Sequence, residues 1–480
     1  MKLRGRHLFL LFCLFVTGTV QADDVFRLQS IVTDGVIQDV FIGDYNGDRR
    51  QDLCLLVIKK TESGIVRELQ LYFQKRPLFA QPDAVLDCPP HTIALDFGEV
   101  LDDGVTRPVL LTEQGVFVWK TDNPDASALV PVIHETHSLY SVQPDRLFRI
   151  PFLVSQGNQN PAIIVWSTPQ QHHVYEKKDG VYCQSRSLPV ISDLCQIGNE
   201  MRFEIPRFVF SGSEESGQHQ FWQLFSHGVF QVDLFAPSDS SKASLWIAPR
   251  YFEERTLYPL DEPKTYFEAE DLDGNGSPDC VAVQSVRGGL TSHISHVQIY
   301  LNRSDQISEM PDQVLLTNNI HGEHQFCDLN RDGLPDLLAF HLKTDLFQAA
   351  QFLFTGNVSV GVDVFLNHQT GFSQTPDQTL SWAMPVRLDA ILLSPFEGWF
   401  AKGDFNGDSY PDLFVQISHG QYLITPGLPS GLFDSAHRQS FELEGSADFD
   451  IADLNGDDHS DLLFLAPQSQ YNTLHCYLSP

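Results

Sequence analysis

A nine-residue pattern that occurs five times restricts the fold of this chain more than any other feature of its sequence. The copies read DYNGDRRQD from Asp44, DLDGNGSPD from Asp271, DLNRDGLPD from Asp328, DFNGDSYPD from Asp404 and DLNGDDHSD from Asp453. All of them fit D-x-[DN]-x-[DN]-x-x-x-D. A pattern that recurs along a chain is typical of a repeat architecture, in which each copy marks one structural unit.

Each copy carries the oxygen ligands that a calcium site requires. Side-chain oxygens at positions 1, 3 and 5 converge inside a tight turn, position 7 can offer its backbone carbonyl, and the carboxylate at position 9 closes the cage. Hard oxygen ligands in this number suit Ca²⁺. The sequence therefore predicts about five bound Ca²⁺ ions, held by Asp44, Asn46, Asp48, Arg50 and Asp52; Asp271, Asp273, Asn275, Ser277 and Asp279; Asp328, Asn330, Asp332, Leu334 and Asp336; Asp404, Asn406, Asp408, Tyr410 and Asp412; and Asp453, Asn455, Asp457, His459 and Asp461.

Two alternatives to this metal site were weighed. An Asp/Asn-rich turn without metal is a reasonable reading of one copy, but five copies in phase favour a metal. An EF-hand begins with the same spacing but needs an acidic residue at position 12 and flanking helices. Position 12 is apolar in every copy here, and β-forming apolar stretches follow each loop, so the loop is predicted to join two strands. The residues at position 12 are Leu55, Ala282, Ala339, Val415 and Phe464.

Further repeated segments define the unit. Strands with alternating apolar residues are predicted at 69–74, 297–302 and 362–367, and each is followed by a related phrase, PDAVL at Pro82, PDQVL at Pro311 or PDQTL at Pro376. Alternation is typical of a half-buried strand. One unit is thus a four-stranded meander of about 57 residues, the spacing from Asp271 to Asp328.

The spacing of the loops gives the number of units. The interval of 227 residues from Asp44 to Asp271 holds four steps, with degenerate loops expected at DFGEVLDDG from Asp96, SQGNQN from Ser155 and SGSEESG from Ser211. We therefore expect eight units, five of them with complete cages. The interval of 76 residues from Asp328 to Asp404 implies about twenty extra residues between Leu338 and Phe400.

The last unit lacks a fourth strand of its own. Strands are expected at 462–466 and 473–479, and the segment 25–31 near the N-terminus has no other partner. If this segment completes the last unit, the sheet edge is covered and a ring closes. The predicted fold is an all-β propeller of four-stranded blades, closed by its N-terminal strand, with residues 23–480 as one domain.

The five loops and the strands around them resemble the FG-GAP/VCBS repeats of integrin α-subunit propellers and of related bacterial secreted proteins. This resemblance implies calcium bound by the side chains at positions 1, 3, 5 and 9 of each complete copy. It also implies that the metal loops share one face and that partners engage the opposite face. Propellers of the integrin type have seven blades, so seven is the alternative to a count of eight.

The N-terminus predicts export. Lys2, Arg4 and Arg6 precede an apolar run at 8–16, and Val20-Gln21-Ala22 ends in a small residue suited to cleavage, which is typical of a signal peptide over residues 1–22. A membrane anchor would need about 20 apolar residues. The chain is therefore expected to be secreted, periplasmic or extracellular, without membrane insertion.

Charge and cysteines narrow the function further. The formal net charge is −31, and loss of the three basic residues of the leader brings it to about −34, which disfavours nucleic-acid partners. Seven cysteines remain after Cys13 is removed, and the spacing of Cys183 and Cys195 suits a hairpin disulfide. Buried free thiols are expected for the others.

The function expected from these features is that of a monomeric binding or adhesion module for a protein or glycan, with structural calcium. A secreted hydrolase or lyase with a loop-built site is the alternative, although the chain has no HExxH, GxSxG or P-loop motif. His172-His173 and His321-Gly-Glu-His324 are interpreted as solvated loop residues. Trp119, Trp166 and Trp222 are expected in the core, whereas Trp382 and Trp399 are candidate glycan platforms.

Removal of the position 9 carboxylate was used to separate a metal role from a role in the turn. If Asp412 serves only calcium, Asp412→Ala should destabilise the protein in calcium but be nearly neutral in EDTA.

Overall fold

A computed structural model describes residues 20–21, 26–62, 64–75, 78–120, 128–134, 138, 142–143, 145–156, 159–168, 171–189, 194–197, 200–203, 207–212, 219–225, 228–233, 244–246, 264–287, 293–303, 306–317, 324–342, 356–368, 371–385, 400–418, 420–443, 449–465 and 471–479. The regular elements in these segments are all β-strands. The described segments contain no helix with the length and apolar character needed to cross a membrane.

The described strands form eight four-stranded meanders, which we number as blades in chain order. The first four consist of β3 (Val36–Gly43), β4 (Asp52–Thr61), β5 (Gly64–Tyr72) and β6 (Ala84–Asp87); β7 (Thr92–Gly98), β8 (Arg107–Thr112), β9 (Gly115–Lys120) and β10 (Ala128–His134); β12 (Leu153–Gln156), β13 (Gln159–Thr168), β14 (Gln171–Lys178) and β15 (Val181–Pro189); and β18 (Arg207–Gly212), β19 (His219–Phe225), β20 (Gly228–Asp233) and β21 (Ser244–Trp246).

The other four blades follow the same order. They consist of β22 (Lys264–Glu270), β23 (Asp279–Arg287), β24 (His293–Tyr300) and β27 (Gln313–Thr317); β28 (His324–Cys327), β29 (Asp336–Leu342), β30 (Asn357–Phe365) and β33 (Gln378–Pro385); β34 (Phe400–Gly403), β35 (Asp412–Ser418), β36 (Gln421–Thr425) and β37 (Gln439–Glu442); and β38 (Phe449–Ala452), β39 (Asp461–Leu465), β40 (Thr473–Leu478) and β2 (Arg27–Val32).

The remaining strands are short additions to this plan. Three hairpins lie beside the blades, namely β16 (Leu194–Ile197) with β17 (Glu200–Phe203), β25 (Asn302–Arg303) with β26 (Gln306–Ile307), and β31 (Asn367–His368) with β32 (Gly371–Phe372). Two strands pair in parallel with a blade edge: β11 (Phe148–Arg149) with β7, and β1 (Val20–Gln21) with β37.

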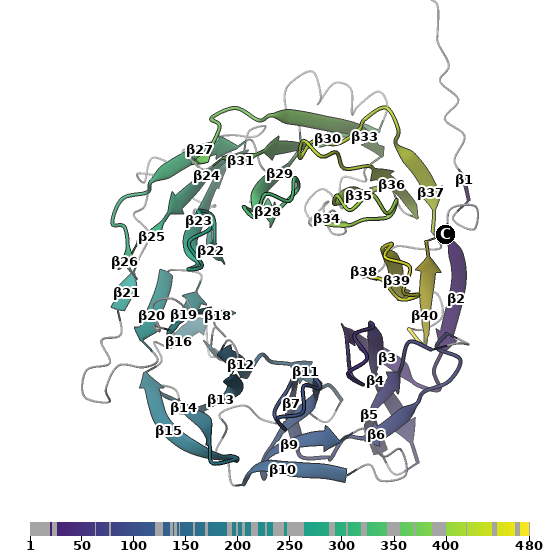
Figure 1. The fold of residues 1–480 in the computed structure, drawn as a ribbon, viewed down its shortest axis with the longest axis vertical. Coiled ribbons are helices and arrows are strands. Elements are labelled where there is room, and N and C mark those ends of the chain that lie inside the picture. The colour runs from purple at the N-terminus through teal and green to yellow at the C-terminus, as the bar shows by residue number, and fades with distance from the viewer. Residues whose placement is uncertain are drawn as a thin grey trace, which may run out of the picture.

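The blades are arranged in a ring, with the first strand of each blade toward the centre and the fourth at the rim (Figure 1). The fold is therefore a β-propeller, as predicted. The predicted closure is also confirmed, because β2 pairs antiparallel with β40 from Arg27 opposite Leu478 to Val32 opposite Thr473. Next to β2, the ring of Phe26 packs 5.3 Å from that of Phe441 in blade 7.

The hydrophobic core lies between blades rather than in one centre. The second strand of a blade is apolar on both faces, as in β4, where residues from Leu53 to Val57 are fully buried. At the closure, Ile37 and Leu55 of blade 1 share one cluster with Leu463 and Leu474 of blade 8. Continuous apolar runs in the sequence therefore became central strands, which neighbouring blades cover from both sides.

The structure locates the longer interval between the third and fourth loops. Its extra residues fall in two connections, 343–356 between β29 and β30 and 386–399 between β33 and β34. Most of the predicted signal peptide, residues 1–19 and 22, lies outside the described residues. β1 precedes the predicted cleavage point, so cleavage there would remove it from the edge of β37.

The predicted Cys183–Cys195 disulfide is wrong. Cys183 is an exposed free thiol in β15, whereas Cys195 belongs to β16 in a separate two-stranded sheet. Two strands in different sheets do not form the hairpin that the spacing suggested. The other thiols that the structure describes are free and at least half-buried, as expected: Cys54, Cys88, Cys280, Cys327 and Cys476.

Candidate metal loops

The five predicted cages are five loops with one backbone geometry, each between the first and second strands of a blade. Position 4 and position 6 both have positive φ in every loop. At position 4 the residues are Gly47, Gly274, Arg331, Gly407 and Gly456, and at position 6 they are Arg49, Gly276, Gly333, Ser409 and Asp458. Glycine is favoured at such positions because it has no Cβ to clash. The sequence signal had identified only some of them.

The carboxylate at position 1 organises the loop from within. One oxygen accepts the N–H of position 5 at 3.1 to 3.2 Å, and the other accepts the N–H of position 6 at 2.6 to 3.0 Å. These carboxylates belong to Asp44, Asp271, Asp328, Asp404 and Asp453, all of them half-buried. Each oxygen keeps a further lone pair with which it could bind a cation.

Positions 3 and 5 are at or near the surface of the loop. In three copies the oxygen of Asn46, Asn330 or Asn406 at position 3 accepts the N–H of position 5 at 2.8 or 2.9 Å. The position 5 side chains in turn accept the N–H of position 7, as Asp48 does from Arg50 at 2.9 Å. The loop therefore holds its ligand side chains by short local hydrogen bonds.

The residue at position 2 was missed by the sequence reasoning. It is apolar or aromatic in each loop and points into the core, with exposure of at most 8%. These anchors are Tyr45, Leu272, Leu329, Phe405 and Leu454. A large apolar residue immediately after the first Asp was the signal that could have revealed it. The anchor fixes the loop to the blade while positions 3 to 6 stay outside.

The aspartate at position 9 is fully buried in all five loops and begins the second strand. Each of its two oxygens accepts a backbone N–H at 2.7 to 3.0 Å, one from position 2 and one from the residue just after the third strand. The aspartates are Asp52, Asp279, Asp336, Asp412 and Asp461, with 0% exposure. The donors after the third strand are Gln74, Asn302, Asn367, Gly427 and Ser479. Position 9 therefore ties two connections of the blade together.

Burial raises the pKa of these five carboxyl groups, although the backbone N–H groups oppose the shift. The pKa is about 6 for Asp52 and Asp336 and about 7 for Asp279, Asp412 and Asp461. The exposed acids of the same loop add to the shift, as Asp404 and Asp408 do for Asp412. A cation in the loop would favour the ionised form of these groups.

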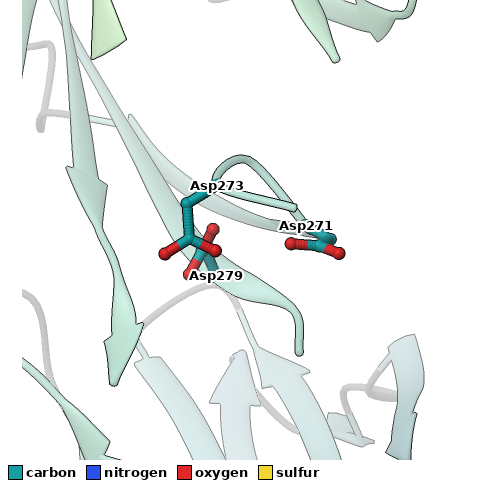
Figure 2. Close-up of side chains that lie close together, drawn as sticks. All are labelled: Asp271, Asp273 and Asp279. Carbon is teal, nitrogen blue, oxygen red and sulfur yellow. The ribbon is translucent and has the colours of Figure 1, made fainter. Parts of the chain in front are cut away.

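One loop brings three carboxylates into range of a single ion. Ligand oxygens of Asp271, Asp273 and Asp279 lie within 4.8 Å of one another, beside the turn that precedes β23 (Figure 2). Two oxygens bound to the same Ca²⁺ at 2.3 to 2.6 Å are at most about 5 Å apart. Within the described residues, no other group of three His, Cys, Asp or Glu side chains is gathered this closely.

The donor set fits calcium better than a softer metal. It consists of carboxylate, amide and carbonyl oxygens, with the carbonyl of position 7 contributed by Arg50, Ser277, Leu334, Tyr410 or His459. The other four complete loops have Asn at position 3, so their carboxylates lie at positions 1, 5 and 9. Their side chains are held around the same backbone turn, but the structure does not bring three carboxylates as close as in the loop at Asp271.

A second repeated aspartate was quoted in the sequence without a role. In the three PD phrases, the Asp side chain accepts the N–H of the residue that follows the third strand by one or two positions, at 2.8 or 2.9 Å, and its own N–H donates to that strand. These residues are Asp83, Asp312 and Asp377. They fix the start of the fourth strand and are structural.

Several predicted side-chain environments need correction. His172 and His173 are not solvated loop residues, because they lie in β14, and His172 is buried against Trp166 with ring centroids 5.6 Å apart. His324 lies in β28, where its Nδ1 is 2.7 Å from the hydroxyl of Tyr266. β-Strand pairing, which the short histidine motifs did not reveal, explains both positions.

The tryptophans divide as follows. Trp119, Trp166 and Trp222 are buried in the core, as predicted. Trp382 lies within β33, half-buried, and the Arg438 guanidinium is 5.3 Å from its ring, so it is not part of an inserted loop. Trp399 lies outside the described residues.

The degenerate loops also differ from expectation. Asp96 lies inside β7, so the turn of that blade begins three residues later than predicted. β12 and β13 are joined by only residues 157 and 158, which leaves no room for a nine-residue loop at Ser155. The turn expected from Ser211 falls largely on residues 213–218, outside the described residues.

Comparison with known proteins gives one family match, to the FG-GAP-like repeat, over residues 271–339. This span contains the loops at Asp271 and Asp328. No curated protein matches the chain by sequence.

Several solved structures are similar to this one. The WD40 domain of SCAP from fission yeast aligns with a TM-score of 0.45 and 10% identity, over 96% of this chain and 97% of that chain. An Agrocybe aegerita lectin that recognises non-reducing terminal N-acetylglucosamine aligns with a TM-score of 0.40 and 12% identity, over 75% and 86%. BBS1N in complex with ARL6DN gives 0.31 and 12%, over 82% and 94%.

Proposed function

We propose that this chain is a secreted, calcium-binding β-propeller that acts as a non-catalytic interaction module for a protein or glycan partner. The observation that carries the proposal is the fivefold recurrence of one loop, in which oxygen side chains surround a turn anchored by a buried aspartate. Such repetition argues for one purpose served in five blades. The match of two loops to the FG-GAP-like repeat supports the same reading.

Calcium would act on the structure rather than on a substrate. The five loops contain fifteen carboxylates at positions 1, 3, 5 and 9, and these repel one another without a cation. Five Ca²⁺ ions would cancel ten of about 34 negative charges in the mature chain. Each ion would also join the loop, which is mostly exposed, to the buried aspartate that begins the second strand.

The partner is expected on the face opposite the loops. Strands alternate in direction, so the connections between strands 1 and 2 and between strands 3 and 4 of a blade share one face. The connections between strands 2 and 3, and from one blade to the next, share the other. A partner on that second face would be bound without disturbing the metal loops.

The metal part of the proposal is tested by stoichiometry and stability. Native mass spectrometry of the full mature chain in calcium should give about five Ca²⁺ per molecule, and EDTA should lower the Tm markedly. A ligand that binds only the folded state adds about 2.7 kcal/mol per site at a hundredfold excess over Kd. Magnesium should rescue poorly, because it requires a small octahedral shell. One bound ion or none would refute it.

The binding part needs a separate measurement. The calcium-loaded chain, immobilised through its C-terminus, is exposed to a glycan array and to proteins secreted by the source cells. Specific binding that is lost in EDTA supports an interaction module. Turnover of a substrate by the purified chain would instead support an enzyme.

A further inference from the structure

Blade 2 contains a sixth copy of the loop, which the nine-residue pattern does not reveal. In the five complete copies, the residue at position 9 begins the second strand and pairs with the last residue of the first strand, as Asp52 does with Gly43. In blade 2 the corresponding pair is Gly98 with Arg107. Arg107 therefore occupies position 9, and Glu99 occupies position 1.

The backbone of this loop follows the others. Asp102 at position 4 and Gly104 at position 6 both have positive φ, of 61° and 75°. Glu99 Oε1 accepts the N–H of Gly104 at 2.7 Å, as the position 1 aspartates accept the N–H of position 6. The N–H of Val105 donates to Asp103 at 3.3 Å, which is the bond from position 7 to position 5.

Arg107 directs its charge at two of the positions that serve as metal ligands elsewhere. The residue is only 1% exposed. Its Nη1 donates to Oδ1 of Asp103, at position 5, at 2.6 Å, and lies 3.4 Å from the carbonyl oxygen of Val105, at position 7. Guanidinium is permanently charged and donates several N–H bonds, so it can satisfy oxygen acceptors that would otherwise face a metal ion.

We propose that Arg107 supplies from within the chain the positive charge that calcium supplies in the other five loops, so that the loop of blade 2 closes without metal. This inference rests on the proposed calcium binding of those loops. A second internal cation reinforces it, because Lys177 of blade 3 lies 2.5 Å from Asp102 and 3.0 Å from the carbonyl oxygen of Val100. The loop is thus held both within its blade and to the next one.

The inference predicts that the loop can be converted into a metal site. Arg107→Asp restores the carboxylate of position 9, and Leu101→Asn restores the amide of position 3, while Glu99 and Asp103 already occupy positions 1 and 5. The double variant of the mature chain should bind one more Ca²⁺ than the wild type by native mass spectrometry. A folded double variant that gains no ion, while the wild type binds calcium, would overturn the inference.

A second measurement decides the case if the double variant does not fold. Arg107→Met and Asp103→Asn should each lower the Tm, by the same amount in calcium and in EDTA, and combining them should be no worse than the more harmful single change. Arg50→Met, at an exposed position of the blade 1 loop, serves as the matched control and should leave the Tm unchanged. Single variants with the wild-type Tm in EDTA would contradict the internal-cation role.

These experiments separate this inference from the proposed function. If the wild type takes up no calcium, the proposed function fails. The Tm values in EDTA still show whether Arg107 and Asp103 hold the loop by charge. If the wild type binds calcium and Arg107→Met is destabilised only when calcium is present, the loop depends on metal and the inference fails.

Discussion

At the scale of single residues, the buried aspartate at position 9 combines two demands on one carboxylate. Its sequence position suggests only a metal ligand. In the structure, Asp412 also accepts the N–H groups of Phe405 and Gly427, both at 2.8 Å. Removal of the side chain leaves these donors without their acceptor in a buried place, and an unsatisfied donor of this kind costs about 1 to 3 kcal/mol.

Asp412→Ala should therefore destabilise the protein in EDTA as well as in calcium, which corrects the expectation of near neutrality without metal. The loss of unfolding free energy in EDTA should be about 2 kcal/mol or more, and calcium should enlarge it. Asp408→Ala at exposed position 5 is the matched control, and its effect should appear only in calcium. Thermal unfolding of both variants in the two buffers gives the answer, and a neutral Asp412→Ala in EDTA would restore a purely metal-binding role.

His172 gives a residue-scale prediction for pH. Burial lowers the pKa of this imidazole to about 3, whereas an unfolded chain titrates near 6.5. The unfolded state therefore takes up the proton first, so the contribution of His172 is complete above pH 6.5 and is lost as the pH falls from 6.5 toward 3. His172→Leu should flatten the acid side of the stability curve relative to the wild type, whereas His173→Leu should not. Parallel curves for His172→Leu and the wild type between pH 7 and 4 would contradict this assignment.

At the scale of strands and loops, glutamines bind neighbouring blades together. Gln378 of β33 donates to the carbonyl of Phe433 at 2.8 Å and accepts the N–H of the same residue at 2.8 Å. Gln313 of β27 makes the same pair of bonds with Phe372, in the next blade. Both glutamines follow a PD phrase, so the phrase fixes the fourth strand and then attaches it to the next blade.

Gln378→Leu should remove both bonds across the boundary between blades 6 and 7. Two hydrogen bonds of net worth near 1 kcal/mol each give an expected loss of about 2 kcal/mol in unfolding free energy. Gln439→Leu, at an exposed position of β37, is the control and should have little effect. Denaturant unfolding of the calcium-loaded chain measures both. A loss for Gln378→Leu no larger than for Gln439→Leu would show that the paired bonds contribute nothing.

The loop of blade 2 shows why the sequence predicts some elements well and others poorly. The closing strand and the five complete loops follow from local patterns, since apolar alternation and oxygen spacing are visible in the chain. The frame of the sixth loop was placed at Asp96, because an aspartate was expected at position 1. Glu99 and Arg107 perform the corresponding tasks with other side chains, and only strand pairing reveals the register. The bonds of position 9 were hidden for the same reason, because their donors lie up to 31 residues away.

At the scale of the whole molecule, each described core cluster joins consecutive blades, and the first and last blades share one as well. Stability is then a property of interfaces around the ring, as in other repeat architectures. β2 has special weight because it lies in blade 8 but precedes blade 1 in the chain. Its Ile31 is buried in the same cluster as Leu55 and Leu474. Loss of β2 would open the edge of β40 and uncover part of this core.

A mature chain that lacks residues 23–32 should therefore be less stable, and it should associate through the exposed edge of β40. Loss of Ile31 alone removes a buried side chain of a kind whose truncation to Ala costs about 2 to 5 kcal/mol. A synthetic peptide of residues 26–32 should restore the Tm in trans, because it can form the six backbone pairs from Arg27 to Val32 and refill the pockets of Phe26 and Ile31. The same peptide with Ile31→Asp keeps the backbone but places a charge in the core, so it should not rescue. Differential scanning calorimetry and light scattering report stability and association, respectively. A truncated chain with the wild-type Tm, or equal rescue by both peptides, would mean that β2 does not hold the ring closed.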